Sequence, residues 1–183
     1  MSGTVGDNVA RASGVIASAG GGGKILQVVQ YVSTAHSVSS TSSTFVDMTG
    51  FEVAITPTAE SSKILVMMNF HGSAGGSLVI KLQRDIASGG YTDVFVGDAD
   101  GSRSQASAGT GAGAVGGTLN IQDKDAIFLD SPSYTLTDEI TYKTQWLQES
   151  SATAMCLNRS TGNTNFIYVP VVASSMTAIE IAA

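Results

Sequence analysis

Residues Ile140–Leu147 read ITYKTQWL and show the clearest periodicity in the chain. Their side chains alternate with a period of two, which is the period of a β-strand. The two expected faces carry Ile140, Tyr142, Thr144 and Trp146 on one side, and Thr141, Lys143, Gln145 and Leu147 on the other. Because Tyr142 and Trp146 share their face with Ile140, we expect these rings to pack into a core and not to form a ligand platform.

Short apolar runs recur from Lys24 onward, with turn-forming residues between them. They are Ile25–Val32, Phe45–Val46, Phe51–Ile55, Ile64–Phe70, Leu78–Leu82, Val94–Val96, Thr118–Ile121, Ala126–Leu129, Met155–Leu157, Phe166–Val171 and Met176–Ile181. No segment has a ten-residue helical period, so the pattern predicts an all-β sandwich or barrel of about eight to ten strands. The run Ile64–Phe70 is apolar throughout, which predicts a strand buried on both faces. Residues 102–117 have no apolar period and predict a long loop.

Residues 1–23 differ from the remainder in composition. They are small and end in four consecutive glycines, Gly20–Gly23, as flexible hinges do. We therefore divide the chain into an arm, residues 1–23, and one β-domain, residues 24–183. The arm is expected to order on a partner, with Val9, Arg11, Val15 and Ile16 as candidate anchor residues. Its apolar patch is short and lacks a basic start, which argues against a signal peptide.

Composition excludes several classes of function. Only 13% of residues are charged, and 9 Lys+Arg against 15 Asp+Glu give a net charge of −6. That balance does not suit a protein that binds nucleic acid by neutralising phosphates. No apolar run approaches the roughly 20 residues that span a bilayer, so no membrane insertion is expected. The single cysteine rules out an intrachain disulfide, and two histidines leave little catalytic chemistry.

Two glycine-containing motifs resemble ligand sites but lack the required context. Gly111–Gly116 matches G-x-G-x-x-G, yet a dinucleotide fingerprint follows a strand and opens a helix, and neither is expected here. Asp98–Ser102 resembles the start of a calcium loop, but the glycine and the glutamate of that template are missing. A mobile loop and an Asp-Gly turn explain these residues, and we expect no cofactor and no metal.

The few chemically reactive side chains do not form a catalytic pattern. His36 and His71 have no G-x-S-x-G motif, and the adjacent carboxylates Asp138 and Glu139 would point to opposite faces of a strand. The metal alternatives are an ion held by His71 on a symmetry axis and a surface cation at the Asp98–Ser102 turn. Cys156 reads as a small core side chain. Asn158–Ser160 matches a glycosylation acceptor and reads as a polar turn.

One aromatic residue is a candidate for contact with a receptor. Tyr91 follows Gly89 and Gly90, so it is expected in a turn and not in the core. Loops carry a large share of the binding residues of proteins. Tyr91 is therefore the candidate receptor contact, with a host surface glycan as the expected ligand class.

Several passages together resemble a group of small tail-fibre-like or capsid-fibre-like virion proteins of marine and freshwater bacteriophages, and the strand plan is similar to the C1q/TNF-like jelly roll. They are GKILQVV at Gly23–Val29, TFVDMTG at Thr44–Gly50, ITP at Ile55–Pro57, SSKILV at Ser61–Val66, ITYKTQ at Ile140–Gln145 and MTAIEI at Met176–Ile181. The resemblance implies a jelly-roll β-sandwich that forms a homotrimer. It also implies that residues 1–23 attach the domain to a capsid, tail or baseplate protein.

Two functional hypotheses follow, and neither is enzymatic. The first is a trimeric fibre or knob on the virion surface that adsorbs to the host. The second is a capsid decoration protein, of the cement or head-fibre type, with a purely structural role. Exposed aromatic side chains in the loops would favour the first hypothesis.

Overall fold

The computed structural model describes residues 24–111, 118–149 and 154–183, and every regular element in these ranges is a β-strand. The strands are β1 (Ile25–Ser33), β2 (Ser39–Ser40), β3 (Val46–Ile55), β4 (Lys63–Ser73), β5 (Val79–Ile86), β6 (Thr92–Val94), β7 (Ala108–Gly109), β8 (Gln122–Asp130), β9 (Ile140–Leu147), β10 (Met155–Leu157) and β11 (Ser174–Ile181). The predicted all-β class is confirmed. Among these residues there is no helix that could cross a membrane.

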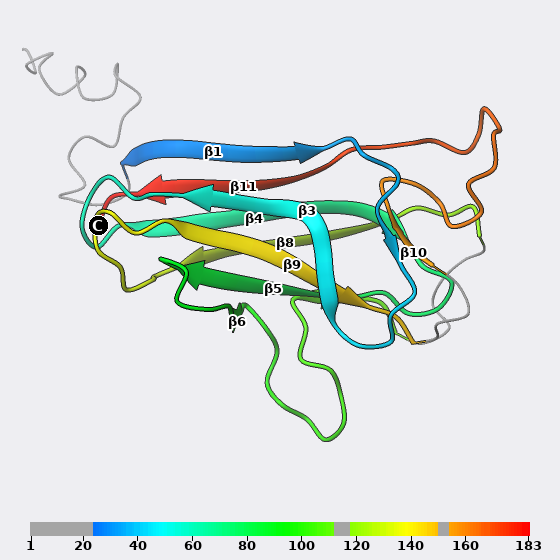
Figure 1. Cartoon of the computed structure of the whole chain (residues 1–183), viewed down its shortest axis with the longest axis horizontal. Coiled ribbons are helices and arrows are strands. Elements are labelled where there is room, and N and C mark those ends of the chain that lie inside the picture. The colour runs from blue at the N-terminus through cyan, green and yellow to red at the C-terminus, as the bar shows by residue number, and fades with distance from the viewer. Residues whose placement is uncertain (1–23, 112–117, 150–153) are drawn as a thin grey trace, which may run out of the picture.

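Two antiparallel sheets pack on each other around one core (Figure 1). In the first sheet β11 and β8 flank β4, β1 pairs with β11, and the short β10 and β2 continue one end. The second sheet has the order β3-β9-β5-β6, with β7 also paired to β5. Successive strands alternate between the sheets, from β3 to β4 to β5 and again from β8 to β9. Curled sheets with this connectivity are compatible with a jelly-roll sandwich.

The core consists of the inward faces of both sheets, as the alternation in the sequence predicts. Ile140, Tyr142, Thr144 and Trp146 of β9 are all buried, and Leu78, Ile80 and Leu82 beside them are buried too. The register places Ile80 opposite Trp146 within the second sheet. Burial of such large side chains is the main stabilising contribution to a domain of this size.

One strand is longer than the sequence pattern indicates. Phe45–Val46 and Phe51–Ile55 were expected as separate pieces, but β3 runs through Val46–Ile55. Its register against β9 shifts between Asp47 and Glu52, and Gly50 has φ of 71° there. An irregularity of this kind lets a strand continue while its alternation is interrupted.

Three sequence predictions about strands are wrong. Phe166–Val171 is not a strand, because its amides are used in tight turns (Phe166 N to Thr164 O, 2.9 Å; Val169 N to Phe166 O, 3.0 Å) and Pro170 has no amide hydrogen to donate. Thr118–Ile121 is a turn that precedes β8. The strand at Ile64–Phe70 is buried on one face only, since Met67 remains 37% exposed in the single chain.

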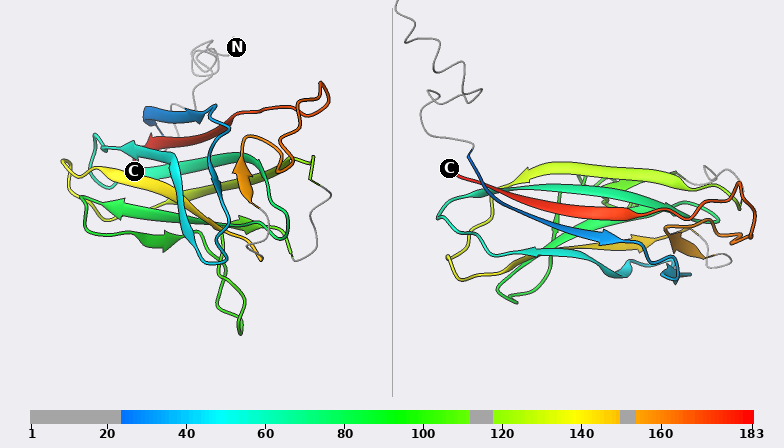
Figure 2. Two further views of the ribbon diagram at one scale, coloured as in Figure 1. Left: turned by 45° about the vertical axis from the view of Figure 1, so that its right-hand side comes forward. Right: turned by 90° about the horizontal axis from the view of Figure 1, so that it is seen from above.

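The two ends of the sandwich differ in what they carry. Lys24 and the C-terminus lie at one end, where the Ala182 amide donates to the Lys24 carbonyl at 2.9 Å. The connection between β10 and β11, residues 158–173, lies at the opposite end (Figure 2). We call residues 158–173 the distal loop. A partner bound at the N-terminal end would therefore leave the distal loop pointing away from it.

A buried carboxylate fastens the loop after β3 to β11. Glu180 is fully buried and accepts hydrogen bonds from the Gln27 amide (2.8 Å), the Thr58 and Ala59 backbone amides (2.9 and 3.0 Å) and the Thr58 hydroxyl (3.0 Å). Burial alone would raise the pKa of Glu180, but these donors and Ser62 outweigh it, and the pKa lies below its ordinary value. The charge is thus stabilised by oriented dipoles.

A hydrogen-bonded cluster of Tyr142, Asp130 and Arg84 links the two sheets. The Tyr142 hydroxyl of β9 donates to Asp130 of β8 at 2.7 Å, and Arg84 of β5 donates to both Asp130 oxygens at 2.8 Å. Burial and the neighbouring carboxylate raise the pKa of Tyr142, so the phenol stays protonated and donates. Phe128, which precedes Asp130 on β8, stacks on Phe95 with 4.9 Å between ring centroids. These contacts are those of a structural cross-link.

Candidate functional site

The outward face of the first sheet carries an apolar surface. Register places Val28, Ile179, Leu65 and Leu129 side by side across β1, β11, β4 and β8, with Met67 and Ile127 in the next row. We call these six residues the apolar face. Ile127 is 57% exposed and Val28 58%, so the chain alone leaves them in water. A sheet face of this composition is normally covered.

The apolar face includes a shallow groove and ends in polar residues. A hollow of about 250 Å³ is lined by side chains from all four strands, among them Met67, Ile127, Gln30 and Thr177. Toward the distal end the rows become polar, and the Asn69 amide donates to Asp125 at 2.8 Å. The apolar surface therefore occupies the half of the sheet nearer the chain termini.

The outward face of the second sheet has the opposite character. Lys143 donates to Asp47 at 2.7 Å and Lys81 pairs with Asp93 at 2.8 Å, while Gln145 and Gln83 donate to the same two carboxylates. We call these six residues the polar face. Hydrogen bonds from Lys143 and Gln145 lower the pKa of Asp47. For Asp93, burial works against ionisation, but bonds from Lys81 and Gln83 prevail and lower its pKa. Paired charges of this kind suit a surface that remains in water.

Tyr91, the candidate receptor contact, lies against the polar face. The Lys143 ammonium lies 3.7 Å from the centroid of the Tyr91 ring, and Lys81 lies 4.1 Å from that of Phe45. Partial burial, followed by the charges of Glu52, Asp85 and Asp47, raises the pKa of Tyr91. The ring is 39% exposed, so a ligand would reach only part of it.

The distal loop holds aromatic side chains that the sequence pattern assigned to a strand. Ile167 and Tyr168 are each 91% exposed, and Phe166 is 62% exposed. The loop base is fixed by Asn158, whose amide donates to the Ser33 carbonyl (2.8 Å) and whose Oδ1 accepts from Ser174 (2.6 Å). Pro170 and the missing alternation were the available signals that this run is a loop.

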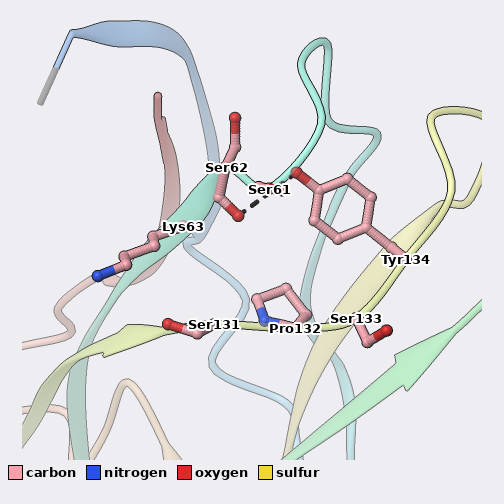
Figure 3. A pocket seen from close by; sticks show the side chains of 7 residues that line it. All are labelled: Ser61, Ser62, Lys63, Ser131, Pro132, Ser133 and Tyr134. Atoms are coloured by element: carbon pink, nitrogen blue, oxygen red, sulfur yellow. Dashed lines mark hydrogen bonds between the residues drawn. The ribbon is translucent and has the colours of Figure 1, made fainter. Parts of the chain in front are cut away.

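A polar pocket of about 350 Å³ lies near the chain termini (Figure 3). Its lining residues are Ser61, Ser62, Lys63, Ser131, Pro132, Ser133 and Tyr134. The Tyr134 hydroxyl donates to the Ala59 carbonyl at 2.7 Å and holds the wall in place. None of the lining residues is a histidine or a carboxylate, and Lys63 is the one titratable amine among them.

The remaining candidate residues are not brought together by the fold. His36 is exposed in the connection after β1, whereas His71 on β4 has its Nδ1 2.8 Å from the Ala173 carbonyl and its Nε2 3.4 Å from Asp123. In the loop after β6, Asp100 pairs with Arg103 at 2.7 Å. Within the described ranges, no three histidine, cysteine or acidic side chains are grouped to hold a metal.

Two further sequence interpretations can be compared with the fold. Cys156 is a buried free thiol, as predicted, and burial raises its pKa. Asn158 lies in a turn, as predicted, with φ of 60°. Its side chain is fully buried, so it is not exposed for glycosylation. The anchor residues Val9, Arg11, Val15 and Ile16 and most of the motif at 111–116 lie outside the described residues.

The chain matches no protein-family model and no curated protein. The geometry of the two outward faces and the distal loop therefore carries the functional argument.

Proposed function

We propose that this chain is a structural protein of a bacteriophage virion, whose β-domain forms a homotrimeric fibre or knob at the virion surface. In this proposal residues 1–23 attach the trimer to another virion protein, and the opposite end adsorbs to the host surface. The observation that carries the proposal is the apolar face. It is a sheet surface that one chain leaves open and that further copies of the same chain would cover.

The energetics favour covering this face. Fully burying a valine, leucine, isoleucine or methionine side chain contributes about 1.5–3 kcal/mol. Val28, Ile127 and Leu129 each retain at least half of their exposure, so several kcal/mol become available in each copy. Three copies around a closed axis would cover this face without leaving an open end, whereas an open arrangement would propagate into filaments.

The polar face supports the same assembly. Its lysines and carboxylates are already paired within the chain, so they gain little from a partner and would be costly to desolvate. One sheet is thus suited to the axis of an oligomer and the other to solvent. The placement of Lys24 opposite the distal loop further suits a knob that is attached at one end and free at the other.

A capsid decoration protein is the alternative, and the same face distinguishes it. If the apolar face lies on a shell protein, the isolated chain has no second copy to cover it and stays monomeric. The decoration role therefore predicts a monomer in solution, while the fibre or knob predicts a trimer.

The mass of the full-length protein in solution tests the proposal. Light scattering is expected to give three times the chain mass of 18.7 kDa. A chain that starts at Lys24 should form the same trimer, because the described β-domain contains the whole apolar face. A clean monomer would overturn the knob and favour the decoration role, and a truncated chain that fails to fold would contradict the assignment of residues 1–23 as an anchor.

A further inference from the structure

The distal loop encloses a hollow that contains unused hydrogen-bonding groups. Its volume is about 360 Å³, within the roughly 300–1,000 Å³ typical of small-ligand sites. Arg159 and Ser160 line it from the start of the loop, Asn163 and Asn165 from the turn, and Val169 and Val171 from the returning segment. From this hollow and the exposed rings beside it we propose a binding site for acidic saccharides, meaning sugars of the hexuronic-acid type.

The first argument is an unsatisfied hydroxyl. Ser160 is fully buried and its Oγ has no hydrogen-bond partner among the residues that the structure describes. Buried polar groups are nearly always paired, because leaving one unpaired costs about 1–3 kcal/mol. The Oγ is closed to solvent in the free chain, so a small opening of the loop would let a ligand hydroxyl in the hollow supply the missing partner.

The second argument is the chemistry of the rim. In the described part of the chain the side-chain amides of Asn163 and Asn165 make no hydrogen bond, so each offers both a donor and an acceptor. Such paired capacity matches the adjacent hydroxyl groups of a sugar. The valines and Pro170 supply the apolar surface that the C–H faces of a pyranose ring can contact.

The third argument is a positioned cation. Arg159 donates from Nε to the His36 carbonyl at 2.7 Å and from Nη1 to the Ser160 carbonyl at 2.9 Å, and within the described ranges it has no carboxylate partner. Its guanidinium is therefore oriented but not neutralised. A planar guanidinium pairs preferentially with a carboxylate, which favours an acidic sugar over a neutral one.

Two exposed rings lie next to the lining residues in the chain. Phe166 follows Asn165 and Tyr168 precedes Val169; neither ring lines the hollow itself, and both are largely exposed and free to contact a ligand that extends beyond it. Tyrosine combines an apolar ring with a polar hydroxyl, which suits wet, hydrogen-bonding interfaces. A membrane is a less suitable partner for this tip, because anionic lipid surfaces attract clusters of basic residues. Arg159 is the single basic residue among those that line the hollow.

This inference rests on the proposed host adsorption, and the loop is held firmly enough to present a site. The Gly162 amide donates to the Thr118 carbonyl at 2.7 Å, and the Val172 amide donates to the Asn158 carbonyl at 3.0 Å. A methyl group at Gly162 would lie 3.0 Å from the Thr118 carbonyl oxygen, a tight contact that glycine avoids. The distal loop is thus braced at its base while its tip remains accessible.

Calorimetric titration of the full-length protein tests the site. The probes are oligogalacturonate and oligomannuronate, with oligogalactose and oligomannose as matched neutral sugars. We expect at least one acidic oligosaccharide to bind, its neutral counterpart to bind at least about tenfold more weakly, and high salt to weaken the acidic complex. Absence of binding by both acidic oligosaccharides would overturn the proposal, as would binding only to phosphatidylcholine or phosphatidylglycerol vesicles.

Variants locate the binding. Tyr168→Ala and Asn165→Ala should each weaken binding by roughly tenfold, since both side chains are exposed and their loss leaves the fold intact. Ser160→Ala should weaken binding without lowering the Tm, a combination that a purely structural hydroxyl would not show. Leu136→Ala is the matched control at an exposed position outside the hollow, and it should bind as the wild type does. Unchanged binding by Tyr168→Ala and Asn165→Ala would refute the assignment.

The same samples separate the two proposals. Light scattering reports the assembly, and the titration reports the site. A trimer that binds no acidic saccharide refutes the site but leaves the trimeric knob standing. A monomer that binds one refutes the knob and retains the site.

Discussion

The outward faces of the two sheets use the same alternation but differ in chemistry. On the first sheet, Val28, Ile127 and Leu129 are exposed without partners, whereas on the second, Lys143 and Lys81 each have a carboxylate and a ring beside them. The polar face is complete within one chain and the apolar face is not. The difference supports the proposal that the first sheet faces an assembly partner and the second faces solvent.

The largest difference between the two faces is expected when a lysine is placed on each of them. Ile127→Lys puts an ammonium into the proposed interface, and we expect the dissociation constant of the assembly to rise by roughly 100-fold or more because a desolvated charge is left unpaired. Ala54→Lys is the matched control, since Ala54 is an exposed residue on the outward side of β3. Light scattering over a dilution series measures both, and equal behaviour of the two variants would contradict the assignment of the faces.

The next largest effect concerns two glutamates, because Glu180 of the first sheet is buried and Glu52 of the second is exposed. Glu180→Ala leaves the backbone amides of Thr58 and Ala59 without their acceptor, while the Gln27 amide loses one of its two acceptors. The substitution should lower the free energy of unfolding by about 3–5 kcal/mol. Glu52→Ala, on exposed β3, should change it by less than about 0.5 kcal/mol. Urea unfolding of the two variants measures this difference. Similar losses of unfolding free energy would show that the hydrogen bonds to Glu180 contribute no more to stability than an exposed carboxylate does.

The pH dependence of stability follows from the same group. The folded-state pKa of Glu180 lies below its ordinary value of 4.5, so the unfolded chain takes up a proton first as the pH falls. Its contribution is therefore fully present above about pH 4.5 and is lost as the pH drops through the folded pKa. The Glu180→Gln variant should show a flatter decline of unfolding free energy between neutral and acidic pH. A decline as steep as that of the wild type would assign the acid sensitivity to other carboxylates.

The smallest effect is expected on the polar face. Lys143→Met removes the ion pair with Asp47 and the cation over Tyr91, and should cost about 1 kcal/mol at low salt. Lys124→Met is the control, because Lys124 donates only to a neighbouring carbonyl among the described residues. Raising the salt concentration should narrow the gap between wild type and Lys143→Met while leaving the mass of the assembly unchanged. Salt-induced dissociation would show that charge, and not the apolar face, holds the copies together.

Much of the fold could be predicted from local pattern. The bounds of Ile140–Leu147 match β9, and its inward set is buried as expected. The prediction failed where an apolar run has no pairing partner, at Phe166–Val171, because composition does not reveal whether a neighbouring strand exists. For the candidate site, the sequence predicted that Tyr91 lies in a turn. It could not predict that the Lys143 ammonium lies over the Tyr91 ring, because Lys143 is 52 residues further along the chain.

Alternation is a property of adjacent residues, so the strands, the inward faces and the all-β class were accessible without any structure. The apolar face is different in origin. Its members come from four strands, and Val28, Leu65, Leu129 and Ile179 become neighbours only through the register of β1, β11, β4 and β8. The hollow under the distal loop also needs contacts across the chain, from Arg159 to His36 and from Gly162 to Thr118. Surfaces assembled from distant segments are decided by tertiary pairing, because a strand's sequence specifies which way its side chains point but not what lies beside them.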